Sequence, residues 1–242
     1  MNLRGALLGI ALLAAASGAA GKDAEPERWT IFATRSGQPA MDGDQFGGNP
    51  FASALVQELG EELRDGPGSP FSDLADGLRE KTIINSFGRQ QADVADVPEG
   101  QSLLPEGKAV ALVIVISDYG NDEGMASLPG AAFDAERMRV ALAGAGFAVQ
   151  AVNVRSREEY RRQIAAFSAR SAKADMAVLY TTGHGMELDG EIWMLPPEYN
   201  IASSSTLDAI NVRELQASLK ARRRNVLFYA GCRDNAFRPV RY

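Results

Sequence analysis

Two side chains that can perform covalent catalysis occur once each in this sequence, Cys232 and His184. A cysteine thiolate is a strong nucleophile, and a neighbouring imidazole makes it accessible near neutral pH. The same imidazole can then protonate the leaving group of a substrate. The alternative for a lone cysteine is a buried, inert core residue, and a single thiol forms no intramolecular disulfide.

Both residues follow short apolar runs of strand length. The segment AVLYTTGHG places His184 just after one run, and NVLFYAGCRDN places Cys232 just after another. In open parallel sheets, reactive groups gather beyond the carboxyl ends of the strands. If the two strands are neighbours, imidazole and thiol face one crevice. Gly185 lets a backbone N–H approach a substrate carbonyl closely, and with the N–H of Cys232 it forms a candidate oxyanion hole.

The rest of the chain supplies the elements that must position this pair. Apolar runs predict strands at 29–35, 109–116, 147–154, 176–181 and 225–229, and helical periodicity predicts helices at 51–63, 71–84, 131–145, 156–170 and 212–222. The run AVALVIVI, residues 109–116, is typical of a strand that is buried on both faces. Alternating strands and helices predict an α/β fold, with a mostly parallel sheet and helices on both faces.

The first 20 residues have the features of a secretory signal peptide. Arg4 is followed by an apolar run at 6–16, and Gly18 and Ala20 are small residues suited to a cleavage site. The run is shorter than the roughly 20 residues that a membrane span needs. We therefore expect a secreted or periplasmic protein that is free of the membrane after cleavage. An uncleaved N-terminal anchor is the alternative.

The charge of the chain argues against nucleic acid as a partner. The net charge is −6, and removal of residues 1–20, which contain Arg4 and no acid, makes it −7. An acidic exported protein is poorly suited to nucleic acid or to an anionic membrane surface. We expect the run Arg222–Arg224 to lie at the end of helix 212–222, where cations interact favourably with the last carbonyls.

The sequence also argues against a resident metal or cofactor. One histidine and one cysteine cannot complete a tetrahedral zinc site without carboxylates. The acidic loop with Asp118, Asn121, Asp122 and Glu123 has two interpretations, a weak calcium site and, preferred here, a solvated turn. We expect no metal and no cofactor.

Four motifs give residues 108–238 a resemblance to the caspase/metacaspase family of cysteine peptidases. They are VIVISDYG after the first strand of this region, LPGAAFDAERM at the next helix, TTGHGMELDG around His184 and AGCRDNAF around Cys232. The 48 positions between His184 and Cys232 (232 − 184) are close to the spacing of about 50 residues that is known for caspases. The resemblance implies a caspase-like three-layer fold with a sheet of about six strands.

The resemblance also implies roles for individual residues. It implies a dyad with no third member, in which His184 is the base and Cys232 the nucleophile, with Gly185 as an oxyanion donor. Asp134 matches an acidic residue that helps to form the S1 pocket of metacaspase-like enzymes; its alternative role is a helix-start aspartate favoured by the helix dipole. The chain departs from the family at Ala230, where metacaspases carry aspartate and caspases glutamine. The arginine behind aspartate specificity in caspases would fall near Leu128, so neither a basic nor an acidic P1 preference is supported.

The order of the segments differs from that of the family. The chain has ten residues after Cys232, whereas a caspase fold needs a further strand and helices there. The segments WTIFATRSGQPAMDG, GNPFASALVQEL, FSDLADGLREK and GRQ resemble, in order, what normally follows the cysteine. We therefore predict one circularly permuted domain over 21–242, in which 29–92 correspond to the family's C-terminal part, 93–107 are a connecting linker and 108–242 carry the dyad. The alternative is a truncated domain with an unrelated N-terminal region.

Two hypotheses about function follow. The first is an exported cysteine endopeptidase that cleaves a peptide or protein substrate through an acyl-thioester on Cys232. The second is a catalytically inactive, caspase-like binding or scaffold protein. Retention of both His184 and Cys232 favours the enzyme. An unrelated doubly wound hydrolase is disfavoured, because the sequence has neither a Gly-x-Ser-x-Gly motif nor a glycine-rich phosphate loop.

Overall fold

A six-stranded sheet forms the middle layer of the protein, in the order β2-β1-β9-β5-β3-β4. The computed structural model describes residues 25–66, 71–94, 102–120, 125–202 and 204–235. The strands of this sheet are β1 (Glu27–Phe32), β2 (Asp93–Val94), β3 (Ala109–Val115), β4 (Ala148–Asn153), β5 (Met176–Thr182) and β9 (Arg224–Tyr229). All neighbouring pairs are parallel except β1 and β2. The predicted α/β fold with a mostly parallel sheet of about six strands is confirmed.

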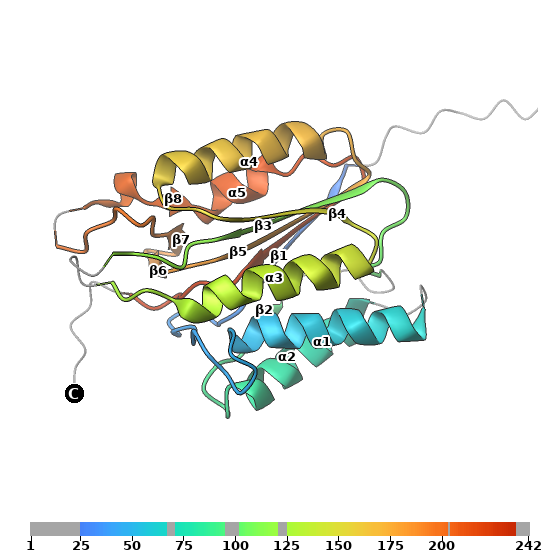
Figure 1. Ribbon diagram of the computed structural model, residues 1–242, viewed down its shortest axis with the longest axis horizontal. Helices are drawn as coiled ribbons and strands as arrows, with labels where there is room; N and C mark the ends of the chain where they lie inside the picture. Colours follow the sequence, from blue (N-terminus) through green and yellow to red (C-terminus); the bar gives the residue numbers. More distant parts are fainter. Residues whose placement is uncertain (1–24, 67–70, 95–101, 121–124, 203, 236–242) are drawn as a thin grey trace, which may run out of the picture.

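Helices cover both faces of the sheet, so the fold has three layers (Figure 1). On one side lie α3 (Pro129–Gly144), α1 (Pro50–Asp65) and α2 (Phe71–Asn85), with α1 packed against both α2 and α3. On the other side lie α4 (Arg157–Ser171) and α5 (Val212–Ser218). The five predicted helices therefore all form, and each of the two faces of the sheet has its own buried cluster.

Local sequence explains where several elements begin. Every residue of β3 and of β5 is buried, as their continuous apolar runs predict for central parallel strands. The side chain of Asn49 accepts a hydrogen bond from the backbone N–H of Phe51 and starts α1. Ser156 does the same for α4 through the N–H of Glu159. These caps satisfy backbone donors that have no partner inside the helix.

Strand β1 joins the start of the described chain to its end. It pairs in parallel with β9 over six residues, from Glu27 opposite Arg224 to Phe32 opposite Tyr229. Without β1, β9 would be an exposed apolar edge strand, which is prone to intermolecular pairing. The strand predicted at 29–35 therefore lies beside the strand that precedes Cys232, although it begins two residues earlier.

The structure corrects one prediction at the end of α5. The helix ends at Ser218 rather than at 222, and Leu219 is extended and buried. Arg222–Arg224 are therefore not at a helix end. Each pairs with an acidic side chain instead: Asp175, Glu106 and Glu27, respectively. Leu219 and Ala221, which follow the helix, are instead buried in the apolar cluster on this face of the sheet.

Two features were not predicted. The segment 93–107, expected to be a linker, contains the edge strand β2 and the fully buried Leu103. A second, antiparallel sheet follows His184, in the order β6 (Gly185–Leu188), β7 (Glu191–Met194) and β8 (Ile210–Asn211).

Some predictions concern residues outside the described part of the chain. These are the signal peptide at 1–20 and the segment Asn121–Glu123 of the acidic loop. Within the described residues, no helix combines the length and the hydropathy that crossing a bilayer requires.

Candidate active site

His184 and Cys232 lie beyond the carboxyl ends of two adjacent strands. β5 and β9 are parallel neighbours, and their register pairs Thr181 with Tyr229. Hydrogen bonds continue this pairing past the strand ends. The backbone N–H of Ala230 donates to the carbonyl of Thr181 at 2.8 Å, and the hydroxyl of Thr182 donates to the carbonyl of Ala230 at 3.1 Å. The expectation that the two strands are neighbours is therefore confirmed. It brings the two candidate catalytic residues to one edge of the sheet.

The imidazole of His184 is held by the segment between β3 and α3, which contains both Tyr119 and Ala126. Its Nε2 lies 2.7 Å from the carbonyl oxygen of Ala126. A carbonyl oxygen can only accept, so this contact places the ring proton on Nε2 and leaves Nδ1 as the basic nitrogen of the neutral ring. The backbone N–H of His184 donates to the hydroxyl of Tyr119 at 2.7 Å, and the two rings meet edge to face, with centroids 4.5 Å apart.

The thiol of Cys232 is covered by the segment that follows β1. The backbone N–H of Ala40 donates to Sγ at 3.2 Å, and Sγ is 3.7 Å from the carbonyl oxygen of the same residue. Burial raises the pKa of this thiol to about 11, and the N–H of Ala40 opposes the rise only in part. Among the described contacts, none joins Sγ to the imidazole of His184. The thiol is therefore largely protonated near neutral pH in this arrangement.

The covering segment is fixed on both sides of Ala40. Backbone hydrogen bonds join Gly37 to Arg233 and Arg233 to Gln38, each at 3.0 Å, so the chain next to Cys232 pairs with residues 37–38. Two residues beyond Ala40, the carboxylate of Asp42 accepts from the N–H groups of Gly130 and Ala131 at the start of α3. Residues 36–42 thus bridge the cysteine loop and the first turn of α3.

Arg233 organises the loop after the nucleophile from a nearly buried position. Its guanidinium pairs with Glu187 of β6 at 2.9 Å and with Asp93 of β2 at 2.7 Å. It also donates to the carbonyl of Thr34 and lies over the ring of Phe32, 4.4 Å from its centroid. A buried arginine with two carboxylate partners is strongly held. Arg233 therefore joins three segments around the cysteine.

Gly185 lies where only glycine fits. A Cβ there would be 1.9 Å from the hydroxyl oxygen of Tyr229 and 2.8 Å from the carbonyl oxygen of Cys232. A Cβ at Gly231 would be 2.6 Å from the same hydroxyl. Tyr229 is fully buried and donates to the carbonyl of Trp193 at 3.1 Å. The two glycines therefore let the His184 and Cys232 loops close around this hydroxyl.

Asp134 is not exposed to a substrate in this arrangement. Its side chain is fully buried, one oxygen accepts from the backbone N–H of Asn49 at 3.0 Å, and Arg137 lies 3.7 Å from the other. Burial raises the pKa of this carboxyl to about 8, against the opposing effects of Asn49 and Arg137. Its observed contacts tie α3 to the start of α1. A role in the S1 pocket stays a prediction.

Several residues around the dyad were not singled out from the sequence. Tyr119 lies inside the quoted motif VIVISDYG. Its position as an aromatic residue just after a buried strand could have identified it as part of the site. Ala40 and Ala126 act through backbone atoms, so no residue type marks them. Arg233 is adjacent to Cys232, but its carboxylate partners come from β2 and β6, neither of which was predicted.

The family model described as Caspase domain matches residues 108–241, which include both His184 and Cys232. A search of curated proteins found no match. Within the described residues, no group of three or more His, Cys, Asp or Glu side chains is arranged to hold a metal ion.

Proposed function

The chain belongs to the caspase-domain family, since the matched residues make up more than half of it, and from this premise we propose that it is a cysteine endopeptidase. The observation that carries the proposal is the adjacency of β5 and β9, which brings His184 and Cys232 to one edge of the sheet. Family membership explains why the only histidine and the only cysteine of the chain occur there.

The proposed reaction has two halves. Nδ1 of His184 takes the thiol proton as Sγ of Cys232 attacks the carbonyl carbon of the substrate. The N–H groups of Gly185 and Cys232 receive the resulting oxyanion. The imidazolium then protonates the amine, the C–N bond breaks and an acyl-thioester remains on Sγ. Water, deprotonated by Nδ1, hydrolyses this thioester and returns the proton to sulfur.

The hydrogen bond from Nε2 of His184 to Ala126 supports this assignment of the base. The imidazolium that forms during attack carries a second N–H, and the Ala126 carbonyl stabilises that cation while Nδ1 exchanges protons. Substrate must also displace Ala40 from Sγ before the carbonyl can be attacked. We therefore infer that the described arrangement is a resting state.

The test is a panel of peptide substrates applied to the mature protein and to Cys232→Ala and His184→Ala. We expect cleavage by the parent chain and none above background by either variant, with an acylated Cys232 detected by intact mass at early times. Cleavage that survives Cys232→Ala would overturn the mechanism. No P1 preference for arginine, lysine or aspartate is expected, because Ala230 and Leu128 lack the side chains that confer those preferences in the family.

A catalytically inactive scaffold is the second candidate, and the covered thiol favours it. Sγ has its described polar contacts with Ala40, and burial holds its pKa at about 11. If no peptide in the panel is cleaved, and Cys232 stays unmodified by a peptidyl electrophile at pH 7, the scaffold is the better account.

We further propose that the domain is circularly permuted. The parallel pairing of β1 with β9 supports this, because it puts the first described strand where a strand from beyond the cysteine is needed. In the family, the segment after the cysteine is the activation-cleavage linker, so the permuted chain should need no such cleavage. Activity in a pure, uncut chain would agree with this. An uncut chain that becomes active only after a protease nicks it would contradict it.

Export is the remaining proposal. The signal-peptide features of residues 1–20 support cleavage after Ala20. The measurement is the N-terminal sequence of the protein recovered outside the cytoplasm of the producing cell, with Gly21 expected as the first residue. A chain that keeps its first 20 residues and sediments with membranes would favour the anchor.

A further inference from the structure

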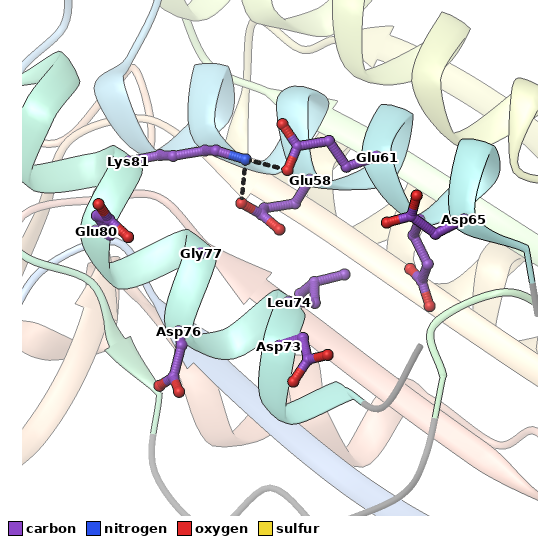
Figure 2. Close-up of a pocket in the computed structure, with 10 residues that line it drawn as sticks. Glu58, Glu61, Asp65, Asp73, Leu74, Asp76, Gly77, Glu80 and Lys81 are labelled. Carbon is purple, nitrogen blue, oxygen red and sulfur yellow. Dashed lines mark hydrogen bonds and ion pairs between the residues drawn. The ribbon is translucent and has the colours of Figure 1, made fainter. Parts of the chain in front are cut away.

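A pocket rich in carboxylates lies between α1 and α2, on helices that the proposed catalytic residues do not use. It has a volume of about 470 Å³, and its lining includes four carboxylates from α1 and three from α2, with Lys81 as the only lysine or arginine among these lining residues. Figure 2 shows Glu58, Glu61 and Asp65 on α1 and Asp73 at the start of α2, whereas Asp76 points away from α1. The volume is within the range of about 300–1,000 Å³ that is typical of small-molecule sites.

Lys81 shows how this pocket holds an ammonium group. Its Nζ bridges Glu58 at 2.6 Å and Glu61 at 2.5 Å, so one cation of the chain already lies between carboxylates of α1 (Figure 2). Glu58 is almost fully buried, and its pKa is raised by that burial, against the effect of Lys81. The other acids in the lining extend the same chemistry along the two helices. Arg64 and Arg79, on the same helices, pair with Glu61 and Asp76, respectively.

Glu62 supplies an independent sign of a missing partner. It lines the pocket and is only 5% exposed. One of its oxygens accepts a hydrogen bond from the hydroxyl of Ser102. The same oxygen accepts another from the backbone N–H of Leu103 at 2.9 Å. The other oxygen is buried and has no hydrogen-bond partner among the described residues. An unpartnered buried carboxylate oxygen costs free energy, and an ammonium group that reached this oxygen from the pocket would remove that cost.

We propose that this pocket binds a small organic cation with two or more ammonium groups. The carboxylates are spread over two helices, and within the described residues no three of them converge closely enough to chelate a metal ion. An extended diamine or polyamine matches such a distribution, because each ammonium meets one or two carboxylates as Nζ of Lys81 does. Glu62 and Asp65 would hold one end of the ligand.

The test uses spermidine, titrated calorimetrically into the full chain at 0.15 M NaCl, where attraction to diffuse surface charge is screened within about 8 Å. We expect saturable binding at one site and a rise in melting temperature. Glu62→Gln should raise the dissociation constant about tenfold, as the loss of one charged hydrogen bond predicts. Asp65→Asn removes an exposed carboxylate of the same lining and should weaken binding in the same direction, even if Glu62→Gln fails to fold.

The matched control is Glu214→Gln, which removes an exposed carboxylate from α5 on the opposite face of the sheet. It should leave spermidine binding unchanged. Equal weakening by Glu214→Gln and by Asp65→Asn would overturn the proposal in favour of non-specific charge attraction. So would Mg²⁺ that competes with spermidine at equal concentration, because this would indicate a metal site. Absence of any saturable binding of spermidine would overturn it outright.

Discussion

The thiol of Cys232 should behave as a latent nucleophile in the resting protein. Its pKa of about 11, against 9.0 for an unperturbed thiol, follows from burial, which the N–H of Ala40 opposes only in part. At pH 7 the thiolate fraction is then about 1 in 10⁴, compared with about 1 in 100 for the unperturbed group. A more basic thiolate is intrinsically more reactive, which offsets roughly tenfold of this difference. The net expectation is a reaction about ten times slower than that of the unfolded chain, before the cover of Ala40 slows it further.

The assay is the reaction of the protein with dithiodipyridine between pH 6 and pH 10.5, followed by absorbance. Cys232 is the only thiol, so the signal is unambiguous. The observed rate should rise about tenfold per pH unit across most of this range, because the thiolate is the reacting species. The same reaction in denaturant gives the unperturbed profile as a control.

His184→Ala tests whether the imidazole affects the ionisation of the Cys232 thiol in the resting protein. Since no described contact joins Sγ to the imidazole, the substitution should leave the profile of the resting protein unchanged. An inflection below pH 8 that disappears in His184→Ala would refute the reasoning, because it would mean that the imidazole already pairs with the thiolate without substrate.

Three further predictions concern the surrounding framework. Gly130→Ala should lower the free energy of unfolding in urea by about 1–3 kcal/mol, because its Cβ would lie 1.8 Å from the carbonyl oxygen of Asp42; the gain of about 1 kcal/mol expected from helix propensity alone would contradict this. Asp134→Asn should flatten the pH dependence of stability. With a folded pKa of about 8, raised from 3.8, the parent carboxyl contributes its full stability below about pH 4 and loses it as the pH rises to 8, at up to about 1.4 kcal/mol per pH unit. The free energies of unfolding in urea at pH 5 and at pH 8 should therefore differ less in the variant than in the parent. Tyr119→Phe leaves the partly buried N–H of His184 without its acceptor and should lower the free energy of unfolding by about 1 kcal/mol in the same measurement; an unchanged midpoint would contradict this.

The fold could be predicted where one local signal dominated. The apolar run of β3 is buried on both faces by helices, so its composition alone identified a central strand. Asn49 and Ser156 marked helix starts because capping depends on neighbouring residues in the chain. Strand β2 could not be found this way. It has two residues, and it exists because the opposite edge of β1 was available for pairing.

The positions of His184 and Cys232 were predictable for a similar reason, because parallel strands present their carboxyl ends to one side of a sheet. Their immediate partners were not. Ala40 is 192 positions from Cys232 and Ala126 is 58 from His184, and both act through backbone atoms that every residue carries. The predicted end of α5 was also wrong, because Leu219 leaves the helix in an extended conformation and is buried by residues from elsewhere in the fold.

The covered thiol and the order of the segments have one physical connection. Ala40 reaches Sγ because β1 pairs with β9 and delivers residues 36–42 to the cysteine loop, where Gly37 and Gln38 bond to Arg233. The same segment ends on the first turn of α3 through Asp42. To uncover Sγ, residues 39–40 must move while both anchors stay in place, namely the backbone hydrogen bonds of Gly37 and Gln38 with Arg233 and the contact of Asp42 with the start of α3. Opening of the site should therefore be a local rearrangement around Ala40, with the sheet unchanged.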